Sequence, residues 1–94
     1  MQKEQAEAIA IRALSYIASE QELLPRFLAL SGIEAGQIRQ AAREPGFLAG
    51  VLQFVLAHEP TLIAFAEASG IPPGDVAAAR KELPFGEEDW DHLP

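Results

Sequence analysis

The chain of 94 residues contains one short phrase twice, and this repeat constrains the fold more than any other feature. Residues 27–33 read F-L-A-L-S-G-I, and residues 65–71 read F-A-E-A-S-G-I, at an offset of 38 positions. Self-similarity at a fixed period is the sequence signature of a repeated structural unit. The sequence therefore predicts one helical unit that occurs twice.

The similarity extends beyond the phrase when residues 14–47 are aligned without gaps on residues 52–85. Ten of the 34 pairs are identical, and they fall mainly on apolar positions and glycines, where a shared structure would place them. Because proline is favoured in the first turn of a helix, the alignment predicts a helix start at Pro60 and at its counterpart Glu22. Each unit is then a helix, a short helix, a Ser-Gly-Ile turn and another short helix, and an approximate twofold axis would relate the two units.

Apolar periodicity predicts an all-α protein, a compact bundle of about six short helices that forms a single domain over residues 1–83. Gly32 and Gly70 are expected to end two helices in the left-handed conformation, with the preceding serines as caps. Residues 47–57 carry a single polar side chain, which predicts a buried central helix that ends at His58. The expected helices are residues 4–18, 22–31, 35–43, 47–57, 60–69 and 73–82.

Composition and charge narrow the classes of function. The chain has no cysteine, which excludes disulfides, thiolate metal sites and a cysteine nucleophile. The net charge is −7, and residues 84–94 hold four acidic residues without Lys or Arg, so this acidic tail contributes −4 of it. An acidic chain is a poor binder of phosphate backbones. The longest apolar run, 11 residues, is well short of the roughly 20 that span a bilayer, so we expect a cytoplasmic protein without a membrane partner.

Candidate catalytic groups are few and poorly placed. His58 and Glu59 could act as an acid–base pair, but sequence neighbours at a helix end are typical of a solvated cap. No base is placed beside Ser31 or Ser69, and their repetition at two helix ends points to capping. Asp89, Asp91 and His92 lack the spacing of a metal site. We therefore predict no enzymatic activity, no catalytic residue, no cofactor and no metal.

Two binding functions remain open. The first is a noncatalytic protein-interaction or regulatory module, whose partner is another protein or a second copy of the chain in a homodimer. Trp90, the only tryptophan, would either fold back on the helical body or anchor a partner, since aromatic residues carry much interface energy. The predicted partner contacts are Trp90, Glu87, Glu88, Asp89 and Asp91.

The second is a DNA-binding regulator. A helix-turn-helix has a small residue four positions before its turn glycine and an aliphatic residue six positions after it, and Ala66, Gly70 and Val76 meet this pattern. Any tight corner between two helices needs similar residues, and the negative net charge disfavours nucleic acid as a partner. The predicted nucleic-acid contacts of this alternative are Arg39, Gln40, Arg43, Arg80 and Lys81.

Three blocks of the sequence carry a resemblance to a known family. They read E-L-L-P-R-F-L-A-L-S-G-I at residues 22–33, F-L-A-G-V-L-Q-F-V-L-A-H-E-P at residues 47–60, and A-F-A-E-A-S-G-I-P-P at residues 64–73. In this order the blocks resemble the small alphaproteobacterial family named domain of unknown function 3572, over roughly residues 13–83. The resemblance implies a bacterial cytosolic protein. It implies no substrate and no functional residue.

Overall fold

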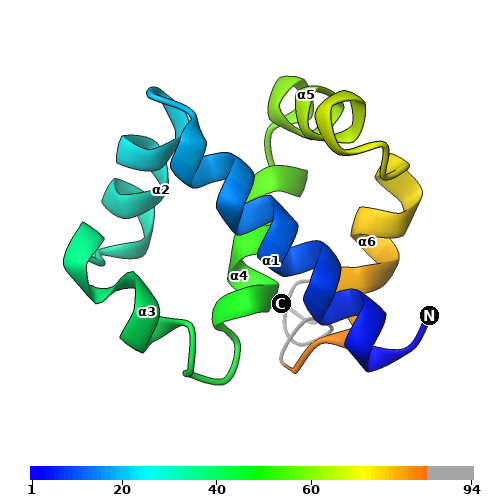
Figure 1. Ribbon diagram of the computed structural model, residues 1–94, viewed down its shortest axis with the longest axis horizontal. Helices are drawn as coiled ribbons and strands as arrows, with labels where there is room; N and C mark the ends of the chain where they lie inside the picture. Colours follow the sequence, from blue (N-terminus) through cyan, green and yellow to red (C-terminus); the bar gives the residue numbers. More distant parts are fainter. Residues whose placement is uncertain (85–94) are drawn as a thin grey trace, which may run out of the picture.

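The computed structural model describes residues 1–84, which form six α-helices and one 3-10 turn (Figure 1). The all-α fold is confirmed, and this part of the chain contains no strand. Residues 85–94, with Trp90 and the four acidic residues of the predicted partner contact, lie outside the described residues. The elements are α1 (Lys3–Ser19), α2 (Leu23–Ser31), η1 (Ala35–Gln37), α3 (Ile38–Ala41), α4 (Phe47–Leu56), α5 (Glu59–Ser69) and α6 (Pro73–Glu82).

The core lies where α1, α4 and α6 meet. Helix α1 turns Ala6, Ala10, Ala13 and Ile17 inward at spacings of three and four residues, the period of one helix face. Because three of these side chains are only methyl groups, α4 and α6 approach the backbone of α1 closely. Helix α4 contributes Ala49, Val51, Leu52 and Val55, and α6 contributes Val76 and Ala79.

Two arms flank this core on opposite sides of α1 and α4, with α2 and α3 in one arm and α5 and α6 in the other (Figure 1). Each arm contains one copy of the repeated phrase, and the two copies fold alike. Gly32 and Gly70 end α2 and α5 with φ of 74° and 77°. The N–H of Ile33 donates to Ser31 Oγ at 3.3 Å, and the N–H of Ile71 donates to Ser69 Oγ at 3.1 Å. The capping role predicted for the repeated phrase is confirmed.

The segments that follow the two corners differ. Helix α6 has ten residues and packs against both α1 and α4, whereas α3 has four residues and packs mainly against the adjacent η1. The predicted helix over residues 35–43 therefore begins with a 3-10 turn and ends early, and Ile38 and Ala41 are only half-buried. A twofold relation between whole units is not confirmed.

The junction between α4 and α5 differs from the sequence prediction in one respect. His58 precedes the first turn of α5 and is not the last residue of α4; its carbonyl accepts from the N–H of Leu62 at 3.0 Å. Its Nδ1 is 2.7 Å from Thr61 Oγ1, a hydrogen bond within the start of α5. Among the described residues, no single helix is long and apolar enough to cross a membrane; α4 and α5 pass that test only as a pair, bent by 107°.

Candidate functional site: an apolar groove between α2 and α4

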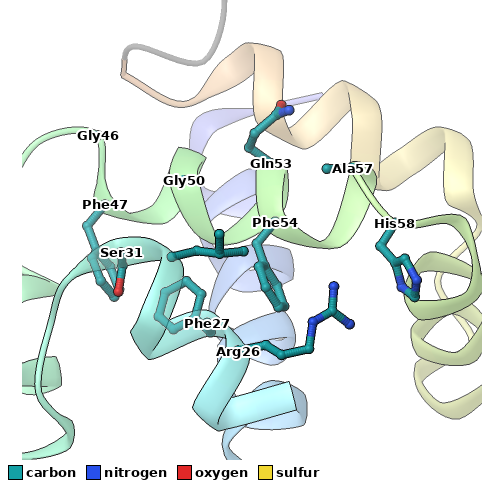
Figure 2. A pocket seen from close by; sticks show the side chains of 11 residues that line it. Arg26, Phe27, Ser31, Gly46, Phe47, Gly50, Gln53, Phe54, Ala57 and His58 are labelled. Carbon is teal, nitrogen blue, oxygen red and sulfur yellow. The ribbon is translucent and has the colours of Figure 1, made fainter. Parts of the chain in front are cut away.

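A groove of about 450 Å³ separates α2 from α4 (Figure 2). We call it the α2–α4 groove. Most of its wall is apolar, and its volume lies within the range of about 300–1,000 Å³ that is typical of small-molecule and cofactor sites. It is lined by Arg26, Phe27, Leu30, Ser31, Gly46, Phe47, Gly50, Gln53, Phe54, Ala57 and His58.

The groove exists because α1, α5 and α6 pack against α4, whereas the apolar side of α4 that faces α2 is left uncovered. Val51, Leu52 and Val55 are fully buried in the core. The opposite side of α4 turns Phe47, Gly50 and Phe54 toward α2, where the two phenylalanines stay half-buried and the glycine is exposed. The sequence prediction of a buried central helix therefore holds for one face only.

Three aromatic rings form the floor of the groove. Phe27 from α2 is 4% exposed, and its ring centroid lies 6.0 Å from that of Phe47 and 5.4 Å from that of Phe54, both in edge-to-face geometry. Such pairs stabilise a fold by about 0.5–1.5 kcal/mol beyond their buried area. Leu30 stands at the rim and is 74% exposed, the most exposed large apolar side chain among residues 1–84. The floor is thus made of packed aromatic rings, while the rim exposes apolar surface.

The ionisable side chains that line the groove are basic residues. The Arg26 guanidinium lies 5.8 Å from the Phe54 ring centroid, and Arg26 and His58 stand at one end of the groove, with Ser31, Gly46 and Phe47 at the other (Figure 2). No Asp or Glu of the described residues lines it. Gln53 points toward α6 and accepts a hydrogen bond from Arg80, so its amide is already engaged (Figure 2). The electrostatics of the groove therefore favour an anionic group.

A second groove, of about 310 Å³, lies between α1 and α5. It corresponds to the first groove in the sequence repeat. At the offset of 38 positions, Arg12, Tyr16 and Phe65 align with Gly50, Phe54 and Phe27. The ring centroids of Tyr16 and Phe65 lie 5.6 Å apart, and the rings pack together as those of Phe54 and Phe27 do. Burial raises the pKa of the Tyr16 hydroxyl, and the nearby Glu20 carboxylate raises it further. We call this hollow the α1–α5 groove; its lining is Ile11, Arg12, Ser15, Tyr16, Ser19, Phe65, Ala68 and Ser69.

The candidate DNA contacts lie on two separate arms. Arg39 and Gln40 are exposed on α3, and Arg43 is exposed just beyond it. Lys81 is exposed on α6, at the other side of the core (Figure 1). Arg80 donates to Gln53, and its helix packs on both α1 and α4. The five residues thus form two separate groups, one on each arm, and each group belongs to one of the two alternative recognition helices.

The remaining sequence candidates occupy helix ends. Ser31 and Ser69 cap the corners, and His58 bonds to Thr61. Sequence reasoning missed the groove itself. The signal that could have found it is Gly50, a glycine inside an otherwise continuous apolar helix, at a position where the repeat has Arg12.

Fold and groove together define a class: a small all-α domain with an apolar, cation-rimmed groove beside its core. Comparison with known proteins then gives the family. The family model described as "Protein of unknown function (DUF3572)" matches residues 3–86, most of the chain, and the chain belongs to that family. The resemblance noted from the sequence is confirmed. No curated protein and no solved structure matches the chain.

Proposed function

We propose that the protein is a noncatalytic protein-interaction module that binds a segment of a partner protein in the α2–α4 groove. The segment would place apolar side chains between α2 and α4 and carry an acidic residue beside Arg26. The observation that carries this proposal is the exposed Leu30 rim over a floor of three packed aromatic rings, of which Phe27 is buried. Interface energy concentrates where such anchors are desolvated in a pocket.

Charge complementarity supports an acidic segment. Arg26 stands at one end of the groove, whereas the loop that leads to Gly46 at the other end carries Arg43 next to Glu44. A partner with an acidic residue at one end would meet Arg26 while its apolar residues fill the centre. Like-charge contacts would disfavour basic segments, so the same arrangement supplies selectivity.

Gly50 makes a sharp test feasible. Gly50 lines the groove, and a Cβ placed on it meets no atom within 4 Å, so the first atom of an added side chain has room there. Gly50→Gln fills the groove without changing charge. Gly74→Gln is the matched control, because Gly74 is also a helical glycine with nothing within 4 Å of an added Cβ, and it lies on α6 away from the groove.

The experiment uses photocrosslinking in cells, with a photoreactive residue at Leu30 and a comparison position at Ile63, an exposed apolar residue of α5. We expect a protein adduct from Leu30 that is absent from Ile63. Fluorescence anisotropy should show that the purified partner binds the wild type and Gly74→Gln with similar affinity. Its affinity for Gly50→Gln should be at least tenfold lower. The cross-linked peptide should contain apolar residues with an Asp or Glu on one side.

Two results would overturn the proposal. One is a partner that binds Gly50→Gln as tightly as the wild type. The other is binding to a DNA duplex at low salt that Arg39→Gln weakens and Gly50→Gln leaves unchanged, which would favour the helix-turn-helix alternative instead.

A further inference from the structure

We propose that the partner segment carries an arginine, which enters the α2–α4 groove beside Gly50 and donates a hydrogen bond to the carbonyl oxygen of Ser31. This inference rests on the proposed function, because it names a group of the segment that this groove binds. The protein itself contains the corresponding contact. In the α1–α5 groove, the Arg12 guanidinium donates to the Ser69 carbonyl at 3.4 Å.

The two helix ends that hold these carbonyls have the same local structure. Gly32 and Gly70 end α2 and α5 with φ of 74° and 77°, and each N–H donates to the carbonyl four residues earlier at 2.9 Å. Neither helix has a basic residue in its own last turn, although a helix C-terminus stabilises cations. Helix α5 receives a cation from α1 through Arg12, whereas α4 has Gly50 at the position that corresponds to Arg12.

The helices beside the two ends are also placed alike. An aromatic pair lies one helical turn away in each groove, with ring centroids 5.6 Å apart beside Arg12 and 5.4 Å apart beside Gly50. Gly50 and Ser31 line one groove, as Arg12 and Ser69 line the other. A Cβ added to Gly50 meets no atom within 4 Å. The space that the Arg12 side chain takes in the α1–α5 groove is therefore open at its base in the α2–α4 groove.

The charges around the Ser31 end of the groove permit a guanidinium there. Arg26 lies at the opposite end, so one segment can place an acidic residue beside Arg26 and an arginine beside Ser31 (Figure 2). No Asp or Arg other than Arg26 lines the groove itself among the described residues. Gly46, at the Ser31 end, also lines a small hollow whose charged members balance, two of each sign: Lys3, Glu7, Arg43 and Glu44.

The first test builds the donor into the full chain. Gly50→Arg places a guanidinium where the repeat has Arg12, and Gly50→Met is the matched control, because Arg and Met have similar helix propensities. We expect the carbonyl carbon resonance of Ser31 to move downfield in Gly50→Arg relative to Gly50→Met. The resonance of Ser69 should move in the same sense in the wild type relative to Arg12→Met. A resonance of Ser31 that does not move, or one of Ser69 that ignores Arg12→Met, would overturn the inference.

The second test uses a small probe in place of the partner. The probe is 4-phenylbutylguanidinium, and its control is 4-phenylbutyltrimethylammonium, which has the same stem and charge but no N–H donor. Amide chemical shifts of the full chain report binding. We expect the guanidinium to bind about threefold more tightly or better, because it alone can donate to the Ser31 carbonyl. Gly50→Gln should abolish its binding, and Gly74→Gln should leave it unchanged.

A third compound, the apolar anion 4-phenylbutanoate, separates this inference from the proposed function. Equal affinities for the two cations, both lost in Gly50→Gln, would refute the hydrogen bond and leave the apolar site standing. Binding of the anion alone, weakened by Arg26→Gln, would also refute the arginine contact while supporting an acidic group beside Arg26. Absence of binding by all three compounds would refute the site itself.

Discussion

The two grooves of this protein occupy corresponding positions of the repeat, yet one is open and apolar while the other is crossed by a side chain. In the α1–α5 groove, the Arg12 guanidinium donates to the Ser69 carbonyl at 3.4 Å, at the end of α5. The α2–α4 groove has Gly50 at the position of Arg12. The carbonyl of Ser31 is then left without the counterpart of this bond among the described residues. Because Gly50 replaces Arg12, the α2–α4 groove lacks the side chain that crosses its counterpart.

The other residues that line the two grooves differ in the same way, with more polar side chains in the α1–α5 groove. The α1–α5 groove has Ser15, Tyr16 and Ser19 where the α2–α4 groove has Gln53, Phe54 and Ala57. The one polar member of the second set, Gln53, is drawn toward Arg80. The two copies of the repeated sequence thus form two similar hollows that differ in the polarity of the side chains that line them.

The largest change in the free energy of unfolding should come from substitution of Phe27 and Phe65, which correspond in the repeat. Phe65 is 1% exposed and Phe27 is 4% exposed, but Phe27 forms the floor of an open groove. We expect Phe65→Ala to lower the free energy of unfolding by about 4 kcal/mol and Phe27→Ala by about 3 kcal/mol, because water can enter the space that Phe27 leaves. Urea titrations followed by circular dichroism measure both. A larger loss from Phe27→Ala would mean that the α2–α4 groove is the tighter of the two.

The two glycine corners at Gly32 and Gly70 should lose similar amounts of stability on substitution, and less than the two phenylalanines do. Gly32→Ala and Gly70→Ala each place a Cβ on a residue with φ above 70°, where nothing lies within 4 Å, so the cost is purely conformational. We expect each to lower the free energy of unfolding by about 1 kcal/mol. Gly36→Ala is the control, since Gly36 has equal space but no positive φ, and it should be nearly neutral. Unequal losses at the two corners would break the local equivalence of the repeat.

These corners belong to the part of the fold that could be predicted from the sequence. The glycine turns and most of the helix bounds follow from local chemistry, so the sequence predicted them, with residues 35–43 as the main exception. The short α3 and the docking of α6 onto α1 and α4 depend on tertiary packing, which no periodicity records. The groove was missed for the same reason: an apolar run such as residues 47–57 indicates that α4 prefers to leave water, but not that one of its faces stays uncovered.

A smaller effect, of opposite sign, should come from Gly50. Alanine is favoured over glycine inside a helix by roughly 0.5–1 kcal/mol, and an added Cβ at Gly50 meets no neighbour. We therefore expect Gly50→Ala to raise the free energy of unfolding by that amount, measured in the same urea titrations. Such a gain would show that the fold does not need this glycine, in keeping with a role for the open space in binding. Destabilisation would instead mean that α2 and α4 are in closer contact than the groove allows.

The smallest effect concerns Tyr16, the only tyrosine and the counterpart of Phe54. Burial, with a further contribution from Glu20, raises the pKa of its hydroxyl above the ordinary value of about 10. The folded state therefore holds the proton more tightly than the unfolded state, so this stabilisation is complete below pH 10 and is lost as pH rises through the folded pKa. Absorbance at 295 nm should show tyrosinate forming at a higher pH than in urea, and Tyr16→Phe should weaken the alkaline fall in stability. An ordinary pKa in the folded chain would place the hydroxyl in water, and the α1–α5 groove would then be as open as its counterpart.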